Sequence, residues 1–275
     1  MKWVKYLIIV VVILVGVGVL SYPFVSNWYN DMISSKAVKD YNAVVTEFDY
    51  SSIEEMREEA RAFNESLASR SDQFSLTDKD LDTYFRLLDV TGTGIMGYIS
   101  IPKLDVKLPV YHGVSDTVLK DAVGHMEGSS MPVGGENTHV LLSGHRGLPS
   151  AKLFTRLDEM TVGDTFYLHV LDEVLAYEVC EVNTVLPEET DLLYLEDGRD
   201  LVTLITCTPY GLNTHRLLVR GERIENNRDS LNVDSEALYT SSREKLVFMG
   251  LILVVCLVGC LAGLWGIFRK RRYDI

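Results

Sequence analysis

The chain has 275 residues, of which 47% are hydrophobic, and it carries a net charge of −13 at pH 7. This length suits one sizeable globular domain with accessory segments better than two full domains. The acidic balance would repel a phosphate backbone, so it argues against nucleic acid as a partner.

An uncharged apolar block runs from Leu7 to about Val25 and is preceded by Lys2 and Lys5. Its length is close to the roughly 20 residues that a helix needs to cross a bilayer. No small-residue cleavage site follows the block, so a retained anchor is favoured over a cleaved signal peptide. We therefore expect residues 1–25 to form a short cytoplasmic start and a transmembrane helix in contact with membrane lipid.

A second uncharged block, residues 246–268, is followed directly by a basic tail, residues 269–275. Basic residues flank membrane spans on the cytoplasmic side. The sequence therefore predicts a protein of the cell membrane with two spans, with both termini in the cytoplasm and the intervening segment outside. Polar residues 224–245 are expected to form a stalk leading to the second span.

Residues 26–94 have a largely helical composition and are expected to form an accessory helical segment. One helix is expected before Asp49 and another after it, the second opening with a capping box at Ser52–Glu55. A polar, irregular stretch follows, and it holds one isolated aromatic residue, Phe74.

Short β-branched or alternating runs separated by turn residues fill residues 95–223. This pattern is typical of an all-β barrel or sandwich. The runs are Gly97–Ile101, Val106–Tyr111, His139–Leu142, Thr165–Leu171, Val174–Val185, Leu201–Thr206 and Leu217–Arg223.

Two cysteines, Cys180 and Cys207, lie between the apolar blocks, which is too few for a disulfide framework. Cys180 is in the middle of a predicted strand and is expected to be buried and inert. Cys207 follows a strand and precedes a turn marked by Pro209 and Gly211, so its thiol is expected at the open end of a strand. A cysteine in this position is a candidate nucleophile, although a structural cysteine is the plainer alternative.

His145 follows another predicted strand and lies between Gly144 and Gly147, which let the backbone turn and leave the imidazole accessible. A nearby imidazole can stabilise a thiolate or exchange its proton.

Arg216 follows Cys207 by a short turn into the next strand, so an antiparallel return would set the two side by side. Its guanidinium can hold a developing oxyanion, and the plainer alternative is a surface arginine paired with Glu222.

These residues resemble a known family. Thr203–Cys207 matches the sortase pattern T-L-x-T-C, and the segments following Cys207 and surrounding His145 are similar to class C, the pilus-assembling branch. Gly97–Lys103 and Leu108–Gly113 share this similarity. The resemblance covers about residues 95–221, and two spans, one at each end, also fit class C.

The resemblance implies a mainly β fold, an eight-stranded barrel with N-terminal helices and a transmembrane helix at each end. It also implies a cysteine transpeptidase in which Cys207, His145 and Arg216 are catalytic. The implied substrates are pilin or surface proteins bearing a Leu-Pro-x-Thr-Gly signal. The signal is cut between Thr and Gly, and the resulting thioacyl enzyme is resolved by the lysine amine of a pilin. No cofactor or metal is implied.

One feature departs from the family pattern. Class C enzymes carry a lid with an Asp-Pro-aromatic motif over the cysteine and histidine, whereas this chain has Asp72, Gln73 and Phe74. The glutamine removes the backbone constraint that proline would supply. Phe74 could still shield Cys207 and Asp72 could still pair with Arg216, or the segment could be an ordinary solvated loop.

Two alternatives remain open. A sortase that attaches surface proteins to the peptidoglycan cross-bridge would use the same three residues and differ only in the resolving amine. A non-catalytic membrane-anchored pilus or surface protein would have a C-terminal span and basic tail. Such a protein also needs a Leu-Pro-x-Thr-Gly signal just upstream of the span, and Ala237–Ser241 does not supply one.

Overall fold

The structure is a computed structural model that describes residues 2–148, 151–225 and 250. These residues belong to two compact units, one containing residues up to Val25 and the other starting at Ser26 and including the barrel. The predicted second span, the basic tail and nearly all of the predicted stalk lie outside the described residues.

The first helix, α1 (Lys2–Val45), is continuous, with Pro23 inside it. The predicted anchor and the predicted first helix of the accessory segment are therefore one element. The part from Val11 onward is long and apolar enough to cross a membrane.

Helix α2 (Tyr50–Ala68) begins earlier than predicted, and its cap is Asp49 rather than Ser52. The carboxylate of Asp49 accepts a hydrogen bond from the backbone N–H of Ser52 at 2.8 Å, which satisfies one of the free donors of the first turn. The expected capping box at Ser52 is therefore wrong. A capping box does occur at the start of α3 (Asp78–Arg86), between Thr77 and Asp80.

Eight strands close into a barrel in the order β1-β2-β3-β4-β7-β8-β6-β5. The predicted seven runs are all present, and the eighth strand, β3, is a short segment that the pattern did not reveal. The strands are β1 (Ile95–Ile101), β2 (Val106–His112), β3 (Val123–His125), β4 (Thr138–Ser143), β5 (Thr165–Val170), β6 (Glu173–Val185), β7 (Asp200–Thr208) and β8 (His215–Ile224). Short helical turns connect them: η1 (Pro102–Leu104), α4 (Asp116–Leu119), η2 (Leu157–Glu159) and η3 (Asp191–Leu193).

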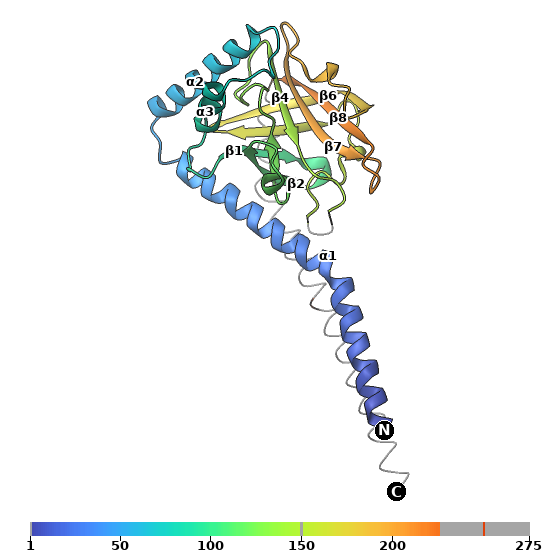
Figure 1. Cartoon of the computed structure of the whole chain (residues 1–275). Coiled ribbons are helices and arrows are strands. Elements are labelled where there is room, and N and C mark those ends of the chain that lie inside the picture. The colour runs from blue at the N-terminus through green and yellow to red at the C-terminus, as the bar shows by residue number, and fades with distance from the viewer. Residues whose placement is uncertain (1, 149–150, 226–249, 251–275) are drawn as a thin grey trace. The chain divides into compact units, whose positions relative to one another are not determined.

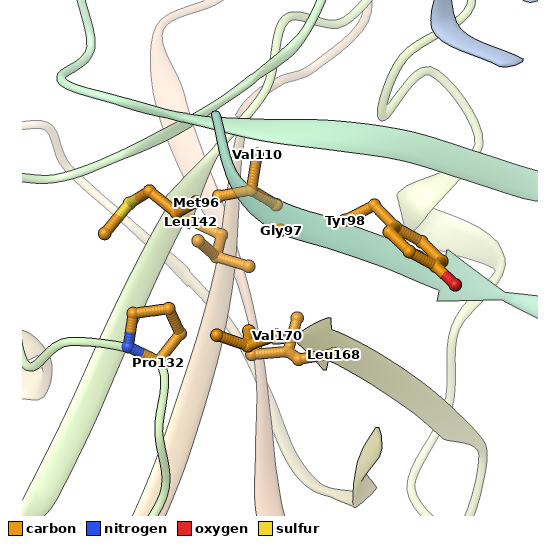
Figure 2. A pocket seen from close by; sticks show the side chains of 8 residues that line it. All are labelled: Met96, Gly97, Tyr98, Val110, Pro132, Leu142, Leu168 and Val170. Atoms are coloured by element: carbon orange, nitrogen blue, oxygen red, sulfur yellow. The ribbon is translucent and has the colours of Figure 1, made fainter. Parts of the chain in front are cut away.

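The interior of the barrel is filled by apolar side chains that alternate along each strand with outward-facing ones. Figure 2 shows part of this interior, where Met96, Leu142 and Val170 converge from different strands. The space between these side chains has no room for a water molecule. A substrate therefore cannot bind in this part of the interior.

The helical segment is fixed to the barrel, and α2 and α3 lie beside it (Figure 1). The buried side chain of Arg57 on α2 pairs with Asp172 in the turn between β5 and β6. The hydroxyl of Tyr41 on α1 donates to the carbonyl of Met96 at 3.1 Å and accepts from the N–H of Leu171 at 2.8 Å. These contacts join residues far apart in sequence, so the accessory helices fold with the barrel.

Two fully buried histidines predict how the stability of the fold depends on pH. His125 Nε2 bonds the carbonyl of Ser130 at 2.9 Å, and His139 Nδ1 bonds the carbonyl of Tyr194 at 2.9 Å. Burial lowers the pKa of each histidine to about 4, whereas an unfolded chain has a value of about 6.5. The unfolded state therefore binds more protons between these values, and acid favours it.

We expect the contribution of these histidines to be complete above about pH 6.5 and to fall by about 1.4 kcal/mol per pH unit for each histidine as the pH drops toward 4. Urea unfolding followed by far-UV circular dichroism at several pH values measures this loss. His139→Asn removes one titrating group, so the stability gap between wild type and this variant should narrow in acid. A gap that does not change with pH would contradict the assignment.

Candidate active site

Cys207 and Arg216 are direct partners across the antiparallel pair of β7 and β8. Residues paired in this way have Cα atoms about 5 Å apart and side chains on the same face of the sheet. Both residues are partly exposed. The predicted return of the chain therefore places the guanidinium beside the thiol on a face that solvent reaches.

His145 follows the end of β4, which pairs in parallel with β7 as far as Ser143 and Ile205. The N–H of Gly144 donates to the carbonyl of Ile205 at 3.0 Å, and the hydroxyl of Thr206 donates to the carbonyl of Gly144 at 2.7 Å. One backbone bond and one side-chain bond thus join Gly144, the residue before His145, to the two residues before Cys207. The structure therefore pairs Cys207 with Arg216 and links the segment before His145 to the segment before Cys207.

The guanidinium of Arg216 has donors to spare. Its Nη1 donates to the carbonyls of Asn213 at 3.3 Å and His215 at 3.1 Å. Among the described residues it has no acidic partner, since Glu222, the alternative that the sequence offered, pairs with Arg199 at 2.8 Å. A permanent positive charge with free N–H groups beside a thiol can bind a substrate oxygen that gains negative charge.

The five other histidines have different surroundings. His112, His125 and His139 are buried in the fold. His169 stacks on Tyr98 with ring centroids 4.2 Å apart. His215 is partly exposed, but it alternates with Arg216 along β8 and its Nδ1 bonds the hydroxyl of Thr214 at 2.9 Å. His145 is partly exposed just after the end of β4.

Cys180 differs from Cys207 in its surroundings. It lies at the bulge in β6, and it is half-buried rather than fully buried as expected. Its thiol donates to the carbonyl of Arg220 at 3.5 Å. Burial raises the pKa of this thiol, so it stays protonated and is a poor nucleophile.

The segment Asp72–Phe74 is bound to the barrel, and the residue that fixes it is Gln73. The buried side chain of Gln73 donates from Nε2 to the carbonyl of Gly128 at 3.2 Å and accepts from the N–H of Leu195 at 2.8 Å. Asp72 accepts from the N–H of Phe74 at 3.0 Å. Within the described part of the chain, Asp72 forms no ion pair with Arg216, so the expected pairing is not seen.

The ring of Phe74 packs on the outer face of the barrel close to the site. It meets Tyr194 edge to face, with centroids 5.2 Å apart, and contacts the apolar cluster of Leu141, Ile205 and Leu218. Ile205 and Leu218 are themselves partners across β7 and β8. They lie two residues from Cys207 and Arg216, respectively, on the same face, so Phe74 covers the surface adjoining the site.

The sequence did not reveal the contacts that Arg146 and Gln73 make. Arg146 donates from Nη1 to the hydroxyl of Thr208 at 3.0 Å and pairs through Nη2 with Asp158 at 2.6 Å. The sequence pattern marked Gln73 only as the residue that stands in place of a proline, and it predicted no contact for its side chain. Both contacts join distant parts of the sequence, so no local pattern could reveal them.

Comparison with known proteins places this geometry in a familiar group. Residues 99–224 match the sortase domain family. The structure is similar to that of sortase C1 from Streptococcus agalactiae, with 45% identity over 70% of this chain and 100% of that chain and a TM-score of 0.68. Sortase C from Streptococcus pneumoniae, whose structure was described in relation to pilin substrate specificity, matches with 42% identity over 70% of this chain and 97% of its own, at a TM-score of 0.62.

A third structure, sortase C from Clostridium perfringens with the C-terminal cell wall sorting motif, is similar as well. Its identity is 40% over 70% of this chain and 100% of that chain, and the TM-score is 0.62.

Gly144 supplies a test of the local packing that holds His145. A Cβ atom on Gly144 would lie 2.7 Å from the ring of Phe154, which is fully buried and has little freedom to move. We expect Gly144→Ala to lower the free energy of unfolding by about 1–3 kcal/mol through overpacking, measured by urea denaturation. Adding Phe154→Leu should recover part of the loss; a double variant with strictly additive losses would contradict the explanation.

Proposed function

This chain belongs to the sortase family of cysteine transpeptidases, and we propose that Cys207 is its nucleophile, His145 its proton shuttle and Arg216 its oxyanion clamp. The observation that carries the proposal is the register of β7, in which Cys207 pairs with Arg216 and the two preceding residues are hydrogen-bonded to Gly144, the neighbour of His145. The partial exposure of all three residues supports it, since a substrate must reach each of them.

The first half of the reaction cuts the sorting signal. Members of the family act on signals of the Leu-Pro-x-Thr-Gly type. The thiolate of Cys207 attacks the carbonyl carbon of the signal's Thr, and the carbonyl electrons move to the oxygen, which Arg216 stabilises. The C–N bond between Thr and Gly then breaks while His145 gives its proton to the departing glycine nitrogen. A thioacyl enzyme remains.

The second half joins the acyl group to an amine. A lysine Nζ attacks the thioester carbon and loses a proton to His145 as the carbon–sulfur bond breaks. An isopeptide bond forms, and the Cys207 thiolate is regenerated beside the imidazolium of His145. Protons therefore balance over the cycle, and these residues complete it without a cofactor.

The acceptor that we propose is a pilin lysine, so that repeated cycles polymerise a pilus. The support is the similarity to sortase C structures, one of them described in relation to pilin substrates. Attachment of surface proteins to the peptidoglycan cross-bridge is the second candidate. It would need no change in the three catalytic residues.

The proposed location is the cell membrane with the barrel outside. Helix α1 can span a membrane, and Lys2 and Lys5 before it favour a cytoplasmic N-terminus. The apolar block 246–268 and the basic tail 269–275 support a second span that returns the chain to the cytoplasm. In this arrangement residues 26–94 and the catalytic barrel 95–223 face the sorting signals of exported proteins, above a stalk at 224–245.

We also propose that Asp72, Gln73 and Phe74 form a lid. Phe74 covers the apolar cluster next to Cys207, where the apolar part of a sorting signal would otherwise lie. Gln73 supports this role, because its two backbone hydrogen bonds replace the constraint that a proline would give. Asp72 stabilises the turn through Phe74 rather than through Arg216.

Purified pilin and a cross-bridge peptide, offered separately and together as acceptors, distinguish the two transpeptidase candidates. We expect mass spectrometry to detect pilin–pilin products that lack the signal from its glycine onward. A reaction that yields only the cross-bridge product would rule out pilus assembly.

Variants of the site test the assigned roles in the same assay. Cys207→Ala should abolish the joining of substrates. A non-catalytic surface protein would show no such activity in the wild type, so this loss would exclude that alternative. Arg216→Lys keeps the charge but loses the fixed fork of donors, so we expect kcat to fall by about 100-fold or more. Normal kcat in Arg216→Lys would remove the oxyanion role from this residue.

Phe74→Ala tests the lid. A half-buried phenylalanine contributes about 1 kcal/mol, which corresponds to about a fivefold shift in the opening equilibrium. The rate at which iodoacetamide alkylates Cys207 should rise by about that factor. Tyr50→Ala, at the exposed start of α2, is the matched control and should leave the rate unchanged; equal rates for both variants would argue against a lid.

A further inference from the structure

Arg146 connects the two chain segments that carry His145 and Cys207. Its guanidinium donates to the Thr208 hydroxyl at 3.0 Å and pairs with Asp158 at 2.6 Å. Arg146 directly follows His145 in the sequence, and Thr208 directly follows Cys207. The contact therefore lies one residue beyond the proposed catalytic pair in both segments.

Burial makes this contact unusual for an arginine. Only 8% of the Arg146 side chain is exposed, whereas its partner Asp158 is 48% exposed. Its Nε is buried and has no hydrogen-bond partner in the part of the chain that the structure describes. Removing a guanidinium from water is costly, and an apolar side chain often gives equal or better stability in such a place. Stability alone therefore does not explain an arginine here.

A second hydrogen bond joins the same two segments on the other side of the proposed catalytic pair. One residue before the catalytic pair, the Thr206 hydroxyl donates to the carbonyl of Gly144 at 2.7 Å. One residue after it, Arg146 donates to the Thr208 hydroxyl. Strand β4 ends at Ser143, so the β4–β7 ladder no longer fixes the distance between the two backbones at His145. The hydroxyls of Thr206 and Thr208 therefore link the two segments just before and just after His145 and Cys207.

We propose that Arg146 is a positioning residue that holds the imidazole of His145 at the working distance from the Cys207 thiol through its bond to Thr208. The inference rests on the proposed function of Cys207 and His145 and adds to it. Arg146 does not touch the substrate; it acts through the backbone of His145. A displacement of about 1 Å at a reacting group can lower a rate by up to about 100-fold.

Thr208→Val and Thr208→Ser form the matched pair that tests this role in the full-length protein in detergent. Valine keeps the shape but removes the acceptor, whereas serine keeps the hydroxyl. We expect Thr208→Val to lower kcat for cleavage of a sorting-signal peptide by about 10-fold or more, with KM nearly unchanged, and Thr208→Ser to retain most of the turnover. Arg146→Lys should resemble Thr208→Val, since one ammonium cannot reach both partners in the same geometry.

A second readout separates positioning from a general loss of fold. The rate of Cys207 alkylation by iodoacetamide rises with pH as the thiolate forms, and a well-placed imidazolium favours the thiolate. The pH of half-maximal rate should move upward in Thr208→Val and stay near the wild-type value in Thr208→Ser, while both variants keep the wild-type circular dichroism spectrum. Equal kcat and equal pH midpoints for the two variants would overturn the positioning role.

Failure of the proposed function would look different. If Cys207→Ala still joined substrates, the nucleophile would be misassigned. The proposed role of Arg146 in positioning His145 relative to Cys207 would then be rejected as well. If Cys207→Ala were inactive while Thr208→Val matched Thr208→Ser, the function would stand and the positioning role alone would be rejected.

Discussion

Strand β7 is hydrogen-bonded on both sides, in parallel to β4 and antiparallel to β8, and this double pairing determines where the chemistry can occur. Val202 and Leu204 of the same strand point into the filled barrel. A slip of one residue would turn these two side chains out of the core and expose Cys207 and Arg216 to different neighbours, so the burial of Val202 and Leu204 fixes the register. With the register fixed, Cys207 pairs with Arg216 on one side, and the segment before His145 is hydrogen-bonded to the segment before Cys207 on the other.

The proposed site and the segment Asp72–Phe74 both lie on the outer face of the barrel. The loop between β6 and β7 is tied to this face by the buried Arg220, which pairs with Glu196 at 2.6 Å, and by His139, which bonds Tyr194. The same loop binds Gln73 through Leu195. The segment Asp72–Phe74 and the β6–β7 loop are therefore connected, so in the proposed lid role a movement of Phe74 would affect the contacts of both.

The sequence predicted the candidate site residues because each lies next to turn residues at the end of a predicted strand. Cys207 and His145 stand at strand ends next to turn residues, and the short return to β8 was enough to predict the pairing with Arg216. The short strand β3 and the cap at Asp49 were missed, since a three-residue strand has no visible alternation and Ser52 offered a competing capping pattern. Arg146 and Gln73 could not be predicted, because their partners are set by the closed barrel. The second span lies outside the described residues and stays a prediction.

The most direct test of this account is to trap the acyl enzyme. The full-length protein in detergent would be mixed with a Leu-Pro-x-Thr-Gly-type peptide in the absence of an amine acceptor, quenched in acid, digested and analysed by mass spectrometry. We expect a thioester adduct that carries the peptide as far as its Thr, located on Cys207 and absent from Cys180. Cleavage of the peptide with the adduct on Cys180, or with no adduct at all on Cys207, would contradict it.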